Sequence, residues 1–495
     1  MKKLSLLRRV LLVVLASVLL ASCGASSGDE TALPKLDPAD PVSLEIWHYY
    51  NGVQKTAFDQ LVTEFNDTVG LEQGIVVEAF SHGNINDLVS NVMDAANKKV
   101  GAGEIPDIFA AYADAAFALD QLGLVAELDA YFTPEELAQY REEYVEEGRF
   151  DAAGSLKIFP TAKAVELMMV NLTDWEKFAS ATGAQLDQLS TIEGVVETAQ
   201  KYYEWTDSLT AEPGDGKAFF GRDAMANYMI IGCRQLGVEI FSVEGGEAVF
   251  HVEKDVIRTL WDNYYVPFIK GYFAAGKGFR SDDAKTGDII ALVGSSTGAA
   301  YFPSKVNLSD TESYNIECWM APAPTFAKGE KFAVQQGAGM VVTKSDKKTE
   351  YAAALFLKWF TEEERNIRFA ASSSYLPVKN AANDADKILE ILRQESDNRL
   401  TPNLEKAFPA AIEEVDTHKM YTSKAFAGSN DARSVLEHAL SDQAAADREL
   451  VLERLGDGMT LEEAAADLVA DQHFDDWFRS FESKLAQQLD TGAAG

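Results

Sequence analysis

Cysteine, histidine and positive charge are all scarce in this chain of 495 residues. It contains three Cys and six His, with no C-x-x-C motif and no Cys/His spacing typical of metal ligands. Its 44 Lys and Arg residues face 78 Asp and Glu residues, so the net charge is −34. Such a surface repels nucleic acid and anionic lipid headgroups. The composition therefore argues against a metal site, a nucleic-acid partner or a membrane-surface binder.

Long apolar runs are missing too, except near the start of the chain. The run "VLLVVLASVLL" follows four basic residues and is about half the ~20 residues that a membrane-spanning helix needs. This pattern is typical of a secretory signal peptide. The following "LLASC" resembles a bacterial lipobox, so we expect removal of residues 1–22, lipidation of Cys23 and a flexible tether over residues 23–40. An ordinary signal peptide with a stray Cys is the alternative.

The two remaining cysteines, Cys233 and Cys318, lie in apolar surroundings, "IIGCRQL" and "NIECWMA". In an exported protein they either form a disulfide or stay as buried free thiols. The sequence leaves both possibilities open.

Strand and helix patterns alternate after residue 40. "VSLEIWHYYNG", "GIVVEAF" and "DIFAAY" read as strands, and helical periodicity separates them; the first helix is expected to end at Gly70. "LKIFP", "AVELMMVN" and "DIIALVGSS" read as further strands, and the final third is mainly helical. Acidic clusters such as "REEYVEE" are expected to be solvated helix faces. The pattern predicts an α/β fold with parallel sheets and a helical C-terminal region.

Residues 294–298, "GSSTG", match the G-x-S-x-G pattern of a serine-hydrolase nucleophile elbow, with Ser296 as the nucleophile. An elbow needs a helix at once, but Pro303 leaves room only for a short one. The candidate bases His418, His438 and His473 lie in polar helical segments, and no oxyanion-type glycine run is present. A secreted hydrolase using Ser296, or a glycosidase using paired carboxylates, is therefore a distant alternative.

Four longer stretches resemble the extracellular solute-binding proteins of bacterial ABC importers, in the family that takes up sugars and related polyols. They begin at "LEIWHYYNG", "IPDIFAAYADAAF", "FDAAGSLKIFPTAKAVELMMVN" and "VQQGAGMVVTKSDKKTEYAAALFLKWF", and the last continues to "YLPVKN". The nearest subgroup resembles glycerol-3-phosphate and glycerophosphodiester binders. This chain departs from that subgroup at Ala113, Lys163 and Ala164, and it offers Arg433 only as a loose match to an expected Arg.

The resemblance implies two α/β lobes that close over a ligand by hinge motion, as in a periplasmic binding protein. It places lobe 1 in residues 41–162 plus 333–376, and lobe 2 with the C-terminal helices in residues 163–332 plus 377–495. It implies a monomeric, non-catalytic lipoprotein without a cofactor. This protein would deliver a carbohydrate to permease subunits served by a cytoplasmic ATPase. A polyol phosphate such as glycerol 3-phosphate is the alternative ligand.

The expected ligand contacts lie at strand ends, crossover segments and glycine turns. Aromatic rings there can stack on sugar faces, and polar groups can pair with hydroxyls. The candidates are Trp47, His48, Tyr112, Asp114, Lys163, Ser295, Ser296, Gly337 and Tyr375. Lys163 has a second interpretation, a salt bridge across the hinge, and Asp114 has a second interpretation as a helix cap.

Overall fold

The computed structural model describes residues 33–244, 247–394 and 400–492. The expected signal peptide, Cys23 and most of the expected tether lie outside these residues. The chain forms two units, Met1–Lys35 and Leu36–Gly495, and the second contains all the elements below. None of the helices in the described ranges is long and apolar enough to span a bilayer.

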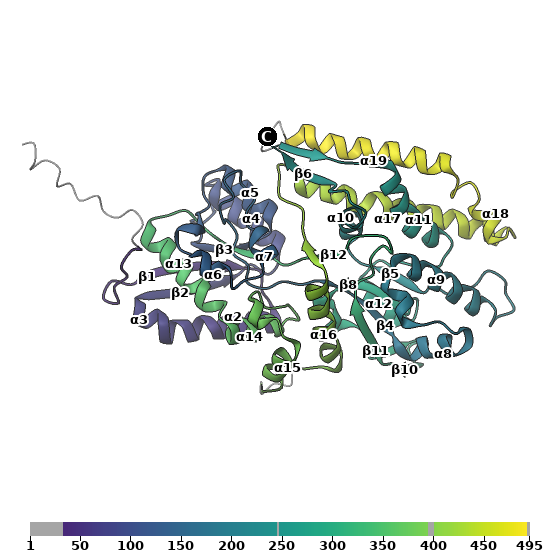
Figure 1. Ribbon diagram of the computed structural model, residues 1–495, viewed down its shortest axis with the longest axis horizontal. Coiled ribbons are helices and arrows are strands. Elements are labelled where there is room, and N and C mark those ends of the chain that lie inside the picture. The colour runs from purple at the N-terminus through teal and green to yellow at the C-terminus, as the bar shows by residue number, and fades with distance from the viewer. Residues whose placement is uncertain (1–32, 245–246, 395–399, 493–495) are drawn as a thin grey trace, which may run out of the picture. The chain divides into compact units, whose positions relative to one another are not determined.

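The first sheet, sheet 1, has the strand order β13-β3-β1-β2 (Figure 1). β1 (Val42–His48), β2 (Ile75–Ser81) and β3 (Ile108–Ala111) are parallel, and β13 (Gly339–Val342) runs antiparallel to β3. Its helices are α2 (Gly52–Phe65), α3 (Leu71–Gln73), α4 (Ile85–Ala96), α5 (Ala113–Gln121), α13 (Lys347–Phe360) and α14 (Glu363–Ala371).

The second sheet, sheet 2, has the order β11-β4-β8-β5. β4 (Glu166–Asn171) is antiparallel to both β11 (Cys318–Pro322) and β8 (Ala291–Ser295), whereas β5 (Phe220–Arg222) is parallel to β8. Its helices are α8 (Leu172–Thr182), α9 (Ile192–Asp207), α10 (Met225–Gln235), α11 (Lys254–Ile269), α12 (Arg280–Thr286) and α16 (Pro402–Thr417).

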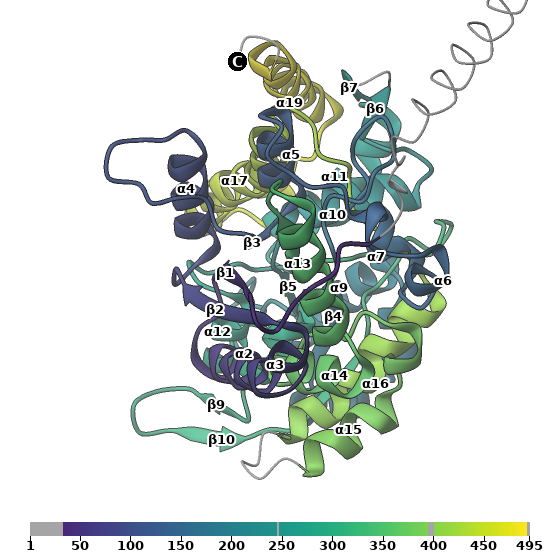
Figure 2. The same ribbon diagram turned by 90° about the vertical axis from the view of Figure 1, so that its left-hand side faces the viewer.

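The C-terminal region consists of α17 (Ser429–Gly456), α18 (Leu461–Ala465) and α19 (Asp471–Gly492). α17 packs on α10 and α11, and α19 lies along α17 (Figures 1 and 2). The shorter elements are α6 (Pro134–Leu137), α7 (Glu142–Glu146), α15 (Ala385–Gln394), β6 (Phe241–Glu244), β7 (Glu247–Phe250), β9 (Lys305–Asn307), β10 (Ser313–Asn315), β12 (Phe332–Val334) and β14 (Lys419–Tyr421).

β4 shows why its sequence is apolar throughout. All six of its residues are buried, because helices or loops cover both faces of the strand. Leu167 and Met169 belong to the core that extends to sheet 1, whereas Met168 and Val170 belong to the core under α9, α10 and α11. The predicted α/β class with a helical C-terminal region is therefore confirmed. The prediction of parallel sheets is wrong in part, because β13 runs antiparallel to β3 and β4 runs antiparallel to both of its neighbours.

Two local predictions are wrong for physical reasons. Gly70 does not end its helix: its φ is −58°, and the chain stays helical to Gln73 before Gly74 turns left-handed at φ +75°. A Cβ on Gly70 would lie 2.6 Å from the Ile75 carbonyl, so this glycine allows a close approach. "LKIFP" forms no strand, only a single backbone bridge between Phe159 and Met340.

Candidate ligand-binding site

The three parallel strands of sheet 1 end at one edge, which we call edge 1. His48, the last residue of β1, lies opposite Ser81, the last residue of β2, and β3 runs beside β1. The residues directly after the strands are Tyr49, His82 and Tyr112. Edge 1 is therefore lined by aromatic side chains.

The corresponding edge of sheet 2, which we call edge 2, is polar. β5 and β8 are parallel, and Asp223 and Ser296 follow them directly. Because β4 runs antiparallel to β8, its first residue Glu166 lies opposite Ser295, the last residue of β8. Edge 2 thus brings together two carboxylates and two serines.

Two crossing segments connect these edges: the first contains Lys163 and Ala164, just before β4, and the second contains Gln336 and Gly337, just before β13. The Lys163 backbone N–H donates to the Leu376 carbonyl at 3.0 Å, and Ala164 pairs with Gln336 at 2.9 Å in both directions. The first segment enters β4 at edge 2, and the second enters β13, where Gly339 lies opposite Ala111 at edge 1. Both edges therefore meet the same hinge, and ligands of open α/β sheets bind outside such strand ends.

Three tyrosines gather at edge 1. Tyr49 shares a side-chain hydrogen bond with Tyr375, and the nearby Tyr375 also raises the pKa of Tyr112. Burial raises the pKa of Tyr112 to about 12 and that of Tyr375 above its ordinary value, so both hydroxyls are protonated donors at neutral pH. Tyr112 remains 41% exposed. The sequence pointed to Tyr112 and Tyr375 but missed Tyr49, whose signal was its place directly after β1.

Trp47 and His48, although predicted as contacts, are largely covered. Trp47 is 9% exposed, its indole N–H donates to Glu45 at 2.5 Å, and its ring lies 4.4 Å from that of His82. His48 is fully buried, and its Nδ1 accepts the Tyr50 backbone N–H at 3.1 Å. Burial lowers the pKa of His48 to about 4, so the ring is neutral. His48 therefore faces the core, while Trp47 borders edge 1.

Lys163 is 2% exposed and serves the hinge. Its ammonium group donates to Glu147 Oε2 at 2.5 Å and to the Gly337 carbonyl at 2.9 Å. Gln335 donates to the same Glu147 oxygen at 2.7 Å. This placement corresponds to the salt-bridge interpretation of Lys163. The expectation that "REEYVEE" is a solvated helix face is wrong for its last residue, because the Glu147 side chain is only 11% exposed.

Gly337 has φ +108°, a region that favours glycine. A Cβ there would lie 2.7 Å from the Ala162 carbonyl and 3.3 Å from the Tyr375 ring. The close approach that requires this glycine is thus between the crossing segments, beside the tyrosines.

Asp114 lies partly exposed in the first turn of α5, where Tyr112 is the N-cap residue without a side-chain cap bond. Asp114 is therefore not the cap.

The serines of the "GSSTG" turn have different environments. Ser296 is 2% exposed, and its hydroxyl accepts the Val165 backbone N–H at 3.3 Å. Ser295 is partly exposed, and its hydroxyl lies 2.9 Å from that of Thr297. A short 3-10 helix, Ser296–Tyr301, follows. Ser295 can face a ligand, whereas Ser296 ties the turn to the crossing segment.

The three candidate hydrolase bases are engaged away from Ser296. His418 bonds with Thr417 and the Glu414 carbonyl, His438 lies 3.8 Å from Asp442, and His473 contacts Asp447 at 2.8 Å. The described residues therefore offer Ser296 no histidine partner. They also contain no group of three His, Cys, Asp or Glu residues placed to hold a metal ion.

A buried polar network at edge 2 was not expected from the sequence. Glu166 accepts from Arg222 at 2.6 Å and from Asn227 at 2.7 Å, and Arg433 of α17 donates to Asn227 Oδ1 at 2.5 Å. Burial raises the pKa of Glu166 despite Arg222. The charge of Arg433 also acts on Tyr112, so α17 lies near edge 1 as well. No carboxylate of the described residues forms an ion pair with Arg433.

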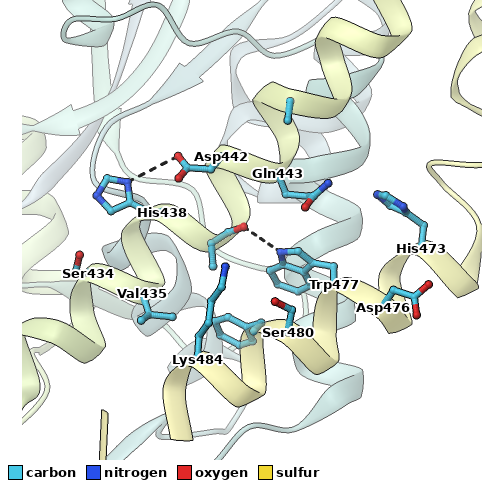
Figure 3. A pocket seen from close by; sticks show the side chains of 13 residues that line it. Ser434, Val435, His438, Asp442, Gln443, His473, Asp476, Trp477, Ser480 and Lys484 are labelled. Atoms are coloured by element: carbon cyan, nitrogen blue, oxygen red, sulfur yellow. Dashed lines mark hydrogen bonds and ion pairs between the residues drawn. The ribbon is translucent and has the colours of Figure 1, made fainter. Parts of the chain in front are cut away.

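A surface hollow away from both edges lies between α17 and α19 (Figure 3). Trp477 and Phe481 are among the residues that line it, and the Trp477 indole donates to the Ala439 carbonyl at 2.9 Å. It contains none of the predicted ligand contacts. A second, much smaller cavity of about 20 Å³ lies behind edge 2 and borders Glu166, Arg222 and Asn227. This volume is close to that of one water molecule.

Cys233 and Cys318 are both free and buried. Cys318 lies in β11 with its thiol 3.1 Å from Asn403 Oδ1, and Cys233 lies in α10. Burial raises the pKa of Cys233 to about 12. Of the two possibilities left open by the sequence, the structure has the free thiols.

Comparison with known proteins shows what this architecture resembles. The model of a family described as bacterial extracellular solute-binding protein matches residues 60–390. No curated protein matches the sequence. A cyclic alpha-maltosyl-1,6-maltose binding protein from Arthrobacter globiformis is 16% identical, with a TM-score of 0.66 over 91% of this chain and all of that one.

Two further solved structures have the same architecture. UgpB from Mycobacterium tuberculosis, in complex with glycerophosphocholine, is 16% identical, with a TM-score of 0.59 over 90% of this chain and 99% of that one. MalE from Bdellovibrio bacteriovorus, bound to maltotriose, is 13% identical, with a TM-score of 0.56 over 91% of this chain and all of that one. These likenesses confirm the two-lobe, periplasmic-binding-protein-like fold.

Proposed function

Since the chain belongs to the bacterial extracellular solute-binding proteins, we propose that it captures a carbohydrate, a sugar or an oligosaccharide, between edge 1 and edge 2. Membership of this family makes it a binding protein and not an enzyme, so the hydrolase alternative based on Ser296 is excluded. The lobes close on the ligand by hinge motion. The proposed lobes are residues 41–162 plus 333–376 and residues 163–332 plus 377–495.

The observation that carries the proposal is the cluster of Tyr49, Tyr112 and Tyr375 at edge 1, opposite a polar edge 2. A carbohydrate needs apolar ring faces for its C–H surfaces and hydrogen-bonding groups for its hydroxyls. Each favourable stack contributes about 0.5–1.5 kcal/mol. An unpaired buried polar group costs about 1–3 kcal/mol. One edge supplies the rings, and the other supplies serine, carboxylate and amide groups.

The predicted contacts divide into two groups. Trp47, Tyr112, Asp114, Ser295 and Tyr375 border the two edges and are proposed to touch the ligand. The more deeply buried residues are proposed to stabilise the strand ends and crossing segments without touching the ligand; they are His48, Lys163, Ser296 and Gly337.

The ligands of the solved relatives support a sugar or polyol-phosphate ligand: they are a cyclic maltose derivative, maltotriose and glycerophosphocholine. We propose that the protein works as a monomer with the permease of an ABC importer and its cytoplasmic ATPase. Lipidation of Cys23 would hold it at the outer face of the cytoplasmic membrane, because two or more acyl chains anchor stably. A Cys23→Ala protein is expected in the soluble fraction; its retention on membranes would contradict the anchor.

The test is to purify the protein gently and record its native mass spectrum, in which a co-purified solute appears as added mass. Thermal unfolding is then measured with sugars, oligosaccharides and polyol phosphates. A ligand at about 100 times its dissociation constant adds about 2.7 kcal/mol to the free energy of unfolding. A Tyr112→Ala/Tyr375→Ala variant should lose this shift. The proposal fails if no carbohydrate stabilises the wild-type protein.

Arg433 favours one second candidate, a polyol phosphate such as glycerol 3-phosphate. Its guanidinium group lies near Tyr112 and forms no ion pair with a carboxylate of the described residues, although its charge also lowers the pKa of the nearby Glu166. Guanidinium groups bind phosphate in a bidentate manner. Arg433→Gln should then abolish stabilisation by glycerol 3-phosphate. If wild-type protein responds to carbohydrates and not to phosphate esters, this candidate is excluded.

A further inference from the structure

Two aromatic side chains are exposed to an unusual degree. Phe279 is 72% exposed and Tyr301 is 79% exposed, which makes them the most exposed aromatic residues in the part of the chain that the structure describes. Neither ring contacts another aromatic ring of the described residues. A ring exposed in this way is available to stack on a ligand.

Phe279 lies in a loop at edge 2. The segment before this loop extends sheet 2, because Phe273 bridges in parallel to Phe220 and the Ala274 N–H donates to the Phe220 carbonyl at 2.9 Å. The chain therefore leaves the sheet at the same edge as β5. It returns through α12, whose Arg280 N–H donates to Asp223 Oδ1 at 3.1 Å.

The backbone around Phe279 is fixed. Arg280 is 5% exposed, and its guanidinium group donates to the carbonyls of Gly276, at 2.7 Å, and of Gly278. Phe279 is the N-cap residue of α12, and its carbonyl accepts the Asp282 N–H at 2.9 Å. The ring thus projects from an ordered loop.

After β8, the strand next to β5, the chain leaves sheet 2 at the same edge and reaches Tyr301. This residue ends the 3-10 helix Ser296–Tyr301, which begins directly after β8. The Asn403 side chain of α16 donates to the Phe302 carbonyl at 2.8 Å and to the Ala299 carbonyl at 3.3 Å. Phe302 itself is 2% exposed. Buried and hydrogen-bonded neighbours therefore hold the backbone at Tyr301 in place.

We infer that Phe279 and Tyr301 form an aromatic rim on edge 2 that extends the binding site and makes it prefer carbohydrate chains of several units over a single sugar. The inference rests on the proposed carbohydrate function and names its ligand class more narrowly. Rings on a fixed backbone lose little conformational entropy when they stack on a ligand. A single sugar held at the tyrosines of edge 1 leaves both rings exposed, whereas a longer chain covers them.

The test uses isothermal titration calorimetry with α-1,4-linked glucose chains and β-1,4-linked xylose chains, each from one to seven units long. Wild-type affinity should rise with length. Phe279→Ala and Tyr301→Ala should each lower the affinity for the longest bound chain about 2- to 10-fold, the effect of one aromatic stack. Affinity for the shortest bound chain should stay within about twofold.

Leu209→Ala is the matched control, because Leu209 is 64% exposed but lies in the loop that enters β5, at the opposite edge of sheet 2. This variant should bind every chain as the wild type does. Length preference that survives in Phe279→Ala/Tyr301→Ala overturns the inference but leaves the carbohydrate function intact. If the wild type binds no chain and no other carbohydrate, the proposed function fails and the inference fails with it.

Discussion

The Lys163 ammonium group and the Glu147 carboxylate form an ion pair of 2.5 Å at the hinge, with side chains that are only 2% and 11% exposed. Lys163 belongs to the first crossing segment, and its second bond reaches Gly337 on the other segment. Glu147 follows α7 and also accepts from Gln335. One buried carboxylate thus connects both crossing segments to α7.

Removal of one partner should destabilise the protein strongly. Lys163→Met leaves Glu147 buried without its cation, and breaking such a pair costs about 3–5 kcal/mol. The double variant Lys163→Met/Glu147→Leu should regain much of this loss, because two apolar side chains leave no unpaired charge. Denaturant unfolding measures all three proteins. Equal stability of the single variant and the wild type would show that the pair is unimportant.

Gly337 provides a second prediction about the hinge. Gly337→Ala forces a left-handed backbone on a residue with a Cβ, which would lie 2.7 Å from the Ala162 carbonyl. Strain of this kind costs about 1–3 kcal/mol, and the clash adds to it. Gly154→Ala separates the two effects, because its φ is +70° but no atom lies within 4 Å of the added Cβ. If both variants show the same loss of melting temperature, the close approach does not matter.

Local patterns predicted β1, β2, β3, β4 and β8, because a buried strand followed by a polar or aromatic turn is visible in the sequence, but they missed the three-residue β5. The same rule placed Tyr112 and Ser295 at strand ends. Partners distant in the chain could not be predicted: Asn227 joins Glu166 across 61 positions and Arg433 across 206. Contacts of this kind depend on how the elements pack.

The burial of Glu147 could not be predicted from the sequence for a different reason. Its acidic neighbours in "REEYVEE" indicate a solvated helix face, and Glu143 and Glu146 are indeed at least partly exposed. Only the end of α7 turns toward the crossing segments, where Lys163 compensates the buried charge. The role of Gly70 could not be predicted either. A glycine that ends a helix and a glycine inside a helix have similar neighbours in sequence, and only the Ile75 carbonyl packed against Gly70 shows which of the two it is.

Tyr112 allows a test that separates its ring from its hydroxyl. Tyr112→Ala should weaken carbohydrate binding about 2- to 10-fold through loss of a stack, whereas Tyr112→Phe keeps the ring and loses only the hydroxyl. Calorimetry with the best ligand from the thermal screen compares them. If Tyr112→Phe loses as much affinity as Tyr112→Ala, the hydroxyl makes the contact and the stacking role is wrong.

His48 makes stability depend on pH. Burial lowers its pKa from 6.5 to about 4, so the unfolded chain binds a proton over this range while the folded chain does not. The stabilisation by neutral His48 is complete above pH 6.5 and is lost as the pH falls toward 4, by up to about 3 kcal/mol. His48→Asn, which retains an acceptor near the Tyr50 N–H, should lose this contribution to the slope. Denaturant unfolding at pH 7, 5.5 and 4 measures it, and His438→Gln is the control because the His438 side chain is 65% exposed. Parallel pH profiles for His48→Asn and the wild type would mean that folding does not change the pKa of His48.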